Sequence, residues 1–128
     1  MSREVITADE FLSSPKMARQ KFDVPVPELG EGKVIPIWGM TPRERSEFED
    51  SRSKWAKANK HQMRERIVFE CARNDDGVKL FTIDQIEKLA QLRGDVFERL
   101  VNVAVDLSGF TAADLETLTK NSEASHSV

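Results

Sequence analysis

Apolar and polar positions alternate over residues 22–26, "FDVPV", with the period of two that is typical of a β-strand with one buried face. The apolar run 34–38, "VIPIW", predicts a return strand. Between them, Gly30 and Gly32 can supply the positive φ angles of a hairpin loop. Because prolines remove hydrogen-bond donors from both arms, we expect a short hairpin that packs on helices, not the centre of a large sheet.

The segment before the hairpin, residues 7–15, reads "TADEFLSSP". Thr7 can cap the start of a helix, and the acids that follow suit its first turn. Pro15 limits that helix to a short piece. We therefore predict that residues 1–20 form an N-terminal arm with a short helix.

After the hairpin, Thr41, Pro42 and Glu44 have the spacing of a capping box with proline at the first helical position. The polar segment "KANKHQ" is the expected break, which gives helices at 42–58 and 62–73. One continuous helix is the alternative. The apolar residues of this region form one narrow stripe at helical spacing. They are Phe48, Trp55, Met63, Ile67 and Cys71.

The stretch "ARNDDGVKLFT" contains an acidic turn that invites comparison with an EF-hand loop. If Gly77 takes the glycine position of such a loop, Ala72 falls at the first ligand position and Ile83 at the twelfth. Neither residue can bind calcium through its side chain. We therefore predict a helix-joining corner, in which Gly77 takes positive φ and Asn74 and Asp75 accept hydrogen bonds from the backbone at the helix end.

Two further helices are predicted at 83–93 and 95–107. Thr82 begins a second capping box, with Ile83, Ile86, Leu89 and Ala90 as the buried stripe, and Asp95 is the expected N-cap of the later helix. That later helix is the most apolar element of the chain. Such a helix is either central to the fold or is covered by another chain on its outer face. The apolar residues that spread beyond its main stripe are Val96, Val103 and Val105.

Gly109 is expected to end this helix, and "TAAD" at 111–114 to cap a last one. Residues 119–128 lack apolar content apart from the final valine, and we expect a flexible tail there. The predicted fold is mainly α, with a small N-terminal β-hairpin packed on a single helical domain (α+β). That domain spans residues 21–118.

Composition narrows the possible classes of protein. The chain has 128 residues, a net charge of −3, 39% hydrophobic and 32% charged residues, and acids and bases are mixed along it. Nucleic-acid binding usually needs a concentrated basic face, so we expect no nucleic-acid partner. A DNA-binding helix-turn-helix motif formed by 83–93 and 95–107 is disfavoured, since its second helix is too apolar to contact base edges in a DNA groove. No apolar run approaches the roughly 20 residues that span a bilayer, and no signal peptide is visible, so we expect a soluble intracellular protein.

The sequence shows no constellation typical of an enzyme. His61 and His126 lie in polar segments without metal-ligand spacing, and Cys71 has no convincing base partner. A buried, reduced thiol is the simpler reading of Cys71. The glycines at 30–32 are followed by neither a third glycine nor a helix, so they form no phosphate-binding loop. We predict a non-catalytic protein with no cofactor and no metal.

The order of these elements resembles a known family. A proline-flanked hairpin leads to the capped helix "MTPRERSEFE" and then to "RERIVFECARNDDGVKLFTIDQIEKL". An apolar helix, a glycine stop and the end "KNSEAS" follow. The pattern, over roughly residues 20–125, resembles the tail assembly chaperones of long-tailed, non-contractile (siphovirus-type) bacteriophages and their prophages. The family has no catalytic signature, and "DDGVKLFT" and "KNSEAS" are its most telling pieces here.

The resemblance implies a role in tail assembly. Such proteins bind the tape measure protein, a long helical polypeptide that sets tail length, and keep it soluble until tail-tube protein polymerises around it. They act in the cytoplasm of the bacterial host and are absent from the mature virion. Many are made in two lengths by a programmed frameshift, and the longer product recruits the tube subunit. The expected partners are the tape measure protein, a second copy of the chain, a frameshifted longer product and tail-tube protein.

Two apolar stripes are candidates for the partner-binding surface. One holds Phe48 and Trp55, and the other holds Val96, Val103 and Val105. The competing reading is that both stripes belong to the core of the protein.

For frameshifting, Lys120 and Asn121 are the candidate site, because their codons can form part of a slippery heptamer. Two further interpretations stay open, namely a structural head-tail or minor tail component of the virion and a cytosolic adaptor protein.

Overall fold

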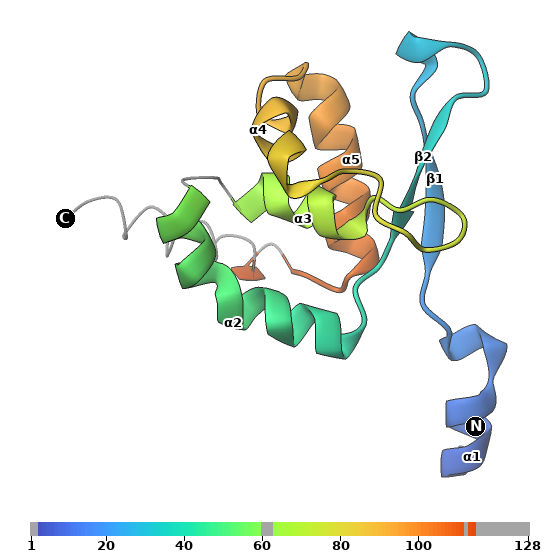
Figure 1. The fold of residues 1–128 in the computed structure, drawn as a ribbon. Helices are drawn as coiled ribbons and strands as arrows, with labels where there is room; N and C mark the ends of the chain where they lie inside the picture. The colour runs from blue at the N-terminus through green and yellow to red at the C-terminus, as the bar shows by residue number, and fades with distance from the viewer. Residues whose placement is uncertain (1–2, 60–62, 112, 115–128) are drawn as a thin grey trace.

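The structure is a computed structural model that describes residues 3–59, 63–111 and 113–114, apart from the side chains of 52–59. Helices dominate it, and a two-stranded antiparallel hairpin near the N-terminus packs against them (Figure 1). The predicted α+β class is confirmed. No helix in the described part of the chain is both long and apolar enough to cross a bilayer.

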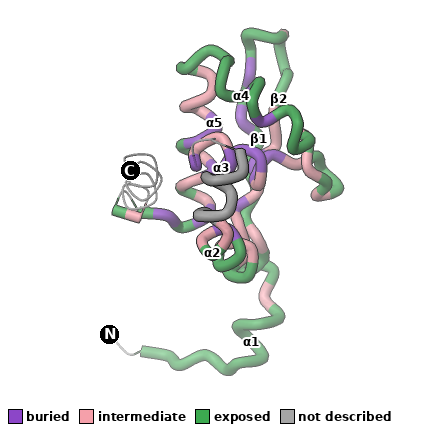
Figure 2. The backbone as a smooth tube through the Cα atoms, turned by 60° about the vertical axis from the view of Figure 1, so that its left-hand side comes forward, coloured by how far each residue is buried: buried purple, intermediate pink, exposed green. Residues whose placement is uncertain are grey.

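The N-terminal segment stands away from the rest of the protein. Helix α1 (Ala8–Ser13) begins after Thr7, whose Oγ1 accepts a hydrogen bond from the backbone N of Glu10 at 3.1 Å. A 3-10 turn, η1 (Pro15–Met17), follows it. Every residue of these two elements is exposed, and the segment lies beyond the base of the hairpin (Figures 1 and 2). The predicted short helix and its cap are confirmed.

The hairpin also forms where its alternating pattern predicts. Strand β1 (Lys21–Pro25) pairs antiparallel with β2 (Val34–Trp38). The connecting loop contains a 3-10 turn, η2 (Pro27–Leu29). Gly30 and Gly32 follow it with φ of +141° and +77°, which side chains rarely adopt, so the two glycines allow the loop to close.

The polar region after the hairpin forms two helices, α2 (Pro42–Asn59) and α3 (Met63–Cys71). The predicted capping box is present at the start of α2. Thr41 Oγ1 accepts a hydrogen bond from Glu44 N at 3.2 Å, and Glu44 Oε1 accepts one from Thr41 N at 3.0 Å. The structure thus has two helices where 42–58 and 62–73 were predicted, and the cap of the first is confirmed.

Helix α3 stops two residues before its predicted end. The reason is that Ala72 pairs with Ile37 of the hairpin in an isolated antiparallel bridge, which draws the chain out of the helix. The acidic turn follows. Asn74 Oδ1 accepts two backbone N–H groups at 2.9 and 3.0 Å, and Gly77 has φ of +82°. The helix-joining corner predicted here is confirmed for Asn74 and Gly77, whereas the side chain of Asp75 pairs with Lys21 Nζ at 3.2 Å.

The next segment is shorter and more exposed than predicted. The capping box at Thr82 is present, but it opens a 3-10 turn, η3 (Ile83–Gln85), that continues into α4 (Ile86–Leu89). The predicted helix at 83–93 therefore ends early. Both ends of α4 are buried, whereas Ile83 and Ala90 are exposed, so the predicted buried stripe was too wide.

The most apolar helix, α5 (Gly94–Leu107), begins one residue earlier than predicted. Its N-cap is Arg93, and the expected cap, Asp95, lies inside the first turn. The side chain of Asp95 accepts hydrogen bonds from Arg93 at 3.1 and 2.7 Å. Gly109, with φ of +77°, follows the end of α5 as predicted.

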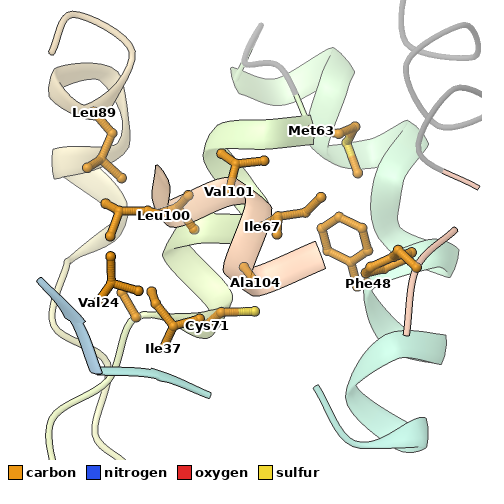
Figure 3. Close-up of a cluster of buried hydrophobic side chains, with 13 residues drawn as sticks. Val24, Ile37, Phe48, Met63, Ile67, Cys71, Leu89, Leu100, Val101 and Ala104 are labelled. Atoms are coloured by element: carbon orange, nitrogen blue, oxygen red, sulfur yellow. The ribbon is translucent and has the colours of Figure 1, made fainter. Parts of the chain in front are cut away.

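Helix α5 lies at the centre of the fold, in contact with α3 and with both strands. Its inner face packs against side chains from the hairpin, α2 and α3 (Figure 3). The core cluster contains Val24, Ile37, Phe48, Met63, Ile67, Val68, Cys71, Ala72, Leu89, Leu100, Val101, Ala104 and Phe110. Burial of apolar area on this scale is the main stabilising term of such a domain.

One glycine is required by close packing between the hairpin and α5. A Cβ atom placed on Gly39 would lie 2.4 Å from the carbonyl oxygen of Leu107. No larger residue can stand there unless the backbone of one element moves. This contact fixes where the end of the hairpin meets the end of α5.

Candidate partner-binding groove

An apolar groove of about 210 Å³ lies between the hairpin loop, the α4 region and the first half of α5. It is lined by Val26, Glu28, Leu29, Ile35, Phe81, Leu89, Leu92, Arg93, Val96 and Leu100. Eight of these ten side chains are apolar, so the groove offers a partner buried hydrophobic contact more than hydrogen bonds. A second hollow shares Phe81, Leu89 and Leu92 and adds Gln85 and Lys88. Together we call the two the tip groove.

The tip groove has a closed floor and open edges. Leu89 and Leu100 form the floor and are 3% and 2% exposed. Leu29 and Leu92 stand at the edges and are 74% and 53% exposed. Large side chains left this open favour contact with another molecule, because burying them removes apolar area from water.

Arg99 of α5 holds the hairpin loop in position beside the groove. Its Nη1 donates hydrogen bonds to the carbonyl oxygen of Pro25 and to Glu28 Oε1, both at 3.0 Å, and its Nη2 donates to Glu28 Oε2 at 2.8 Å. The hydrogen bond from Arg99 lowers the pKa of Glu28 to about 2. Paired hydrogen bonds of this kind fix orientation as well as distance. The wall formed by the loop is therefore tied to α5.

Basic side chains border the groove on the α4–α5 side. Arg93 lines the groove and is paired with Asp95. That ion pair lowers the pKa of Asp95 through the hydrogen bonds that Arg93 donates. Lys88 lines the second hollow. Because Asp95 offsets the charge of Arg93 and the ionised Glu28 also lines the groove, the groove offers apolar contact more than a net charge.

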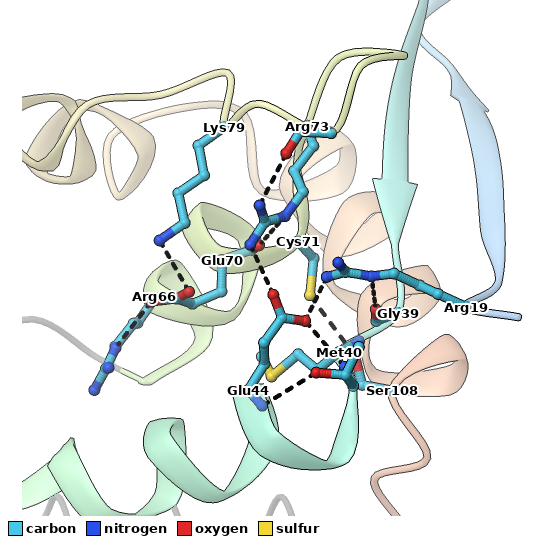
Figure 4. Close-up of polar contacts among 12 residues, drawn as sticks. Arg19, Gly39, Met40, Glu44, Arg66, Glu70, Cys71, Arg73, Lys79 and Ser108 are labelled. Carbon is cyan, nitrogen blue, oxygen red and sulfur yellow. Dashed lines mark hydrogen bonds and ion pairs between the residues drawn. The ribbon is translucent and has the colours of Figure 1, made fainter.

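A polar hollow of about 330 Å³ lies elsewhere, between α2 and α3 (Figure 4). Glu44 at its edge accepts hydrogen bonds from Arg19 and Arg73 as well as from the backbone of Thr41. Burial raises the pKa of Glu44, but the Thr41 backbone hydrogen bond and the two arginines outweigh it, and the net shift is downward. Because its pKa is lowered and both of its oxygens accept hydrogen bonds, this carboxylate is a weak base that joins separate elements together.

Cys71 does not have the surroundings of a reactive thiol. It is fully buried, and its Sγ lies 3.7 Å from Ser108 Oγ. Burial raises the pKa of Cys71 to about 11, so the thiol is protonated near neutral pH. Over residues 3–59, 63–111 and 113–114, no group of three or more His, Cys, Asp or Glu side chains is arranged to hold a metal ion.

No protein-family model and no curated protein matches this chain. Among solved structures, the chain is similar to the tail assembly chaperone of bacteriophage HK97. The two share 19% sequence identity and superpose with a TM-score of 0.47, over 77% of this chain and 94% of that chain. A likeness of this degree identifies neither a partner nor a binding site.

The structure separates the residues predicted to bind a partner. Val96 lines the tip groove, whereas Val103 and Val105 are partly buried and pack against the core cluster. Phe48 is 1% exposed and packs edge-on against Phe110, with 5.9 Å between ring centroids. Phe48 is therefore a core residue in this structure and is not part of an open surface.

Three other predicted site residues cannot be placed. Trp55 falls within α2, but its side chain lies outside the described part of the structure. Lys120 and Asn121, the frameshift candidates, also lie outside the described residues, as does the predicted tail at 119–128.

Sequence reasoning missed most of the groove. Leu29 is an isolated apolar residue in a turn segment, so no helical or strand period marks it. Leu92 follows Leu89 at helical spacing, but the helix ends at Leu89 and leaves Leu92 exposed. Ile35 and Phe81 belong to separate segments that only the tertiary fold brings together. The available signal was a large aliphatic residue in an otherwise polar turn, such as Leu29 in "PELGEG".

Proposed function

We propose that this chain is a non-catalytic tail assembly chaperone of a long-tailed bacteriophage or prophage, and that it binds the tape measure protein through the tip groove. The observation that carries the proposal is the open apolar groove, with Leu29 and Leu92 exposed at its edges. The resemblance in the order of elements and in "DDGVKLFT" supports the choice of partner.

The groove suits an amphipathic helix as its ligand. A tape measure chain carries long apolar stripes and would aggregate if these stayed bare. A helix can place its apolar face in a hydrophobic groove with anchors spaced three and four residues apart. A specific complex needs about 1,000 Å² of buried surface or more, so the helix would also contact surface beyond the groove.

The proposal includes where the protein acts. It would work in the cytoplasm of the bacterial host, bring the tape measure protein to tail-tube protein, and be absent from the mature virion. Purified particles provide the check. Retention of this chain in washed virions would favour the alternative role of a structural head-tail or minor tail component.

A longer frameshifted product is a further part of the proposal. Lys120-Asn121 can be encoded by AAA followed by AAC or AAT, which forms a slippery heptamer if the preceding codon ends in A. The nucleotide sequence tests this directly. Codons that prevent tandem slippage, together with the absence of an overlapping downstream frame, would remove the two-product model and leave the groove proposal intact.

Co-expression with the tape measure protein of the same genome tests the proposed function. We expect the tape measure protein to be insoluble alone and to become soluble and co-purify when this chain is present. The matched control is the Leu92→Asp variant, which places a charge at the edge of the groove. Equal rescue by the variant, or no rescue by the unaltered chain, would refute groove binding.

A further inference from the structure

The segment that follows α5 crosses to α2 and is held there. We define the strap as residues 109–114, of which the structure describes all but residue 112. Within the described part, Phe110 is buried, whereas Gly109 and Thr111 are exposed. The ring of Phe110 packs edge-on against Phe48 of α2, with 5.9 Å between the ring centroids. The strap therefore helps to cover Phe48, which is 1% exposed.

Arg45 of α2 holds the strap through several contacts. Its Nη1 donates a hydrogen bond to the carbonyl oxygen of Gly109 and its Nη2 donates one to Asp114 Oδ2, both at 3.1 Å. Its guanidinium group also lies over the ring of Phe110, 4.3 Å from the centroid. Its Nε donates to Glu49 Oε1 at 3.0 Å, one turn further along α2, which orients the guanidinium group. A single side chain of α2 thus contacts the strap at three points, and we call it the latch.

The end of α5 is fixed immediately before the strap begins. Ser108 Oγ accepts a hydrogen bond from the backbone N of Met40 at 3.0 Å, and the carbonyl group of Leu107 packs directly against Gly39. Gly109 follows with φ of +77° and is exposed. Because glycine has the widest backbone freedom of any residue, Gly109 is the position at which the strap can turn without disturbing α5.

We propose that the strap is a flap that turns about Gly109, releases Arg45 and uncovers Phe48 while the rest of the domain stays folded. Opening breaks the contacts of Phe110 and Arg45, which are a small part of what global unfolding removes. Local openings of this kind have lower free energies than global unfolding. The surface that opens is separate from the tip groove, whose lining residues lie within 26–35 and 81–100. Its test therefore does not depend on the proposed function.

Amide hydrogen exchange of the full chain, measured residue by residue by NMR, tests the flap. The amide of Phe110 donates to the Val105 carbonyl oxygen at 3.1 Å across the hinge, so it exchanges whenever the strap opens. The amide of Ser108 donates to the Ala104 carbonyl oxygen at 3.1 Å before the hinge, so it reports fraying of α5. We expect the protection factor of Phe110 to be about tenfold or more below that of Ser108. Equal protection of the two amides would overturn the proposal, since the strap would then open only together with α5.

Variants of the latch test its part in the closed state. Arg45→Met keeps an apolar stem beside Phe110 but loses the donors, so the protection of Phe110 should fall about tenfold while that of Val101 in α5 stays unchanged. Arg43→Met is the matched control, because Arg43 is exposed and lies two positions earlier in the same helix. It should behave like the unaltered chain. Asp114→Asn weakens the latch from the strap side, and it replaces Arg45→Met if that variant changes the circular dichroism spectrum. Equal losses at Phe110 and Val101, or no loss at Phe110, would overturn the proposal.

Dye binding reports the surface that opening uncovers. Phe110→Ala removes the ring that packs on Phe48, so the folded variant should bind more 8-anilinonaphthalene-1-sulfonate than the unaltered chain does. The tip groove is the same in both proteins, so its share of the dye signal cancels in the comparison. No additional dye binding by a folded Phe110→Ala protein would show that Phe48 stays covered without the strap, and would overturn the proposal.

Discussion

Arg99 donates hydrogen bonds to both carboxylate oxygens of Glu28, across 71 positions of the chain. The pair joins the hairpin loop to the middle of α5 and thereby sets one wall of the tip groove. The loop is also held by its own backbone hydrogen bonds, such as Val26 N to Lys33 O at 2.8 Å and Leu29 N to Val26 O at 3.1 Å, and the pair ties this loop to α5. One surface ion pair thus contributes to the geometry of a candidate binding surface.

We predict that the Glu28–Arg99 pair makes an acid-sensitive contribution to the free energy of unfolding. The ordinary pKa of Glu28 is 4.5 and Arg99 lowers it to about 2. A carboxylate with a lowered pKa in the folded state contributes stability above pH 4.5, and this contribution is lost as the pH falls from 4.5 toward 2. Glu28→Gln should therefore be less stable than the unaltered chain at pH 7, and the difference should vanish near pH 2. Urea denaturation midpoints across this range measure it.

Glu31→Gln is the control for that titration, because Glu31 is an exposed acid in the same loop. Its stability should follow that of the unaltered chain at every pH. A constant difference between Glu28→Gln and the unaltered chain from pH 7 to pH 2 would show that the ion pair does not form in solution.

Gly39 should be intolerant of any side chain. A Cβ atom there would meet the Leu107 carbonyl oxygen at 2.4 Å, so Gly39→Ala must push the hairpin and α5 apart. Overpacking of this kind costs about 1–3 kcal/mol in unfolding free energy. Chemical denaturation measures the loss.

Gly94→Ala is the matched control for Gly39→Ala. A Cβ atom on Gly94 meets nothing within 4 Å, and alanine is the better helix former, so stability should stay level or rise. Equal stability of the two variants would mean that the close approach of the hairpin to α5 is absent.

Much of the fold was predictable because its signals are local. The period of two in 22–26, the capping boxes at Thr41 and Thr82 and the glycine after α5 each mark an element within a few residues. The errors arose where a distant contact decides the outcome. Ala72 leaves the helix to pair with Ile37, and this pairing cannot be read from either segment alone.

The candidate site was less predictable than the fold. A stripe at helical spacing does not show which of its residues other elements will cover. Phe48 is buried in the core, whereas Val96 borders a groove. Leu29 stands in a turn, which has no period to analyse, and Leu92 keeps the helical spacing of Leu89 but lies beyond the end of α4. Surface sites assembled from several short segments therefore need the tertiary structure.

Phe48 provides a test of the distinction between core and surface. Phe48→Ala should lower the unfolding free energy by about 3–5 kcal/mol, since it leaves a cavity next to Phe110. Phe48→Leu should cost less and keep any binding of the tape measure protein. Thermal unfolding and co-purification measure the two effects. Lost binding in a stably folded Phe48→Leu protein would place Phe48 at the partner surface after all.

The thiol of Cys71 should be inert in the folded protein. It is buried, and its pKa of about 11 leaves little thiolate at neutral pH. Ellman's reagent should react slowly in buffer and rapidly in denaturant, with a native rate that follows the unfolding equilibrium across a urea series. Rapid reaction of the folded chain would show that Cys71 is accessible and that this part of the core opens.

The most direct test of groove binding is the affinity of tape measure segments for three versions of the chain. Calorimetry with soluble tape measure fragments should find a segment that binds the unaltered chain. A Val78→Asp control should bind that segment equally, since Val78 is exposed, apolar and outside the groove. Leu92→Asp should weaken that binding about tenfold or more, since the loss of one anchoring side chain costs more than 1.4 kcal/mol. Equal affinity of all three versions for every segment that binds would contradict the account.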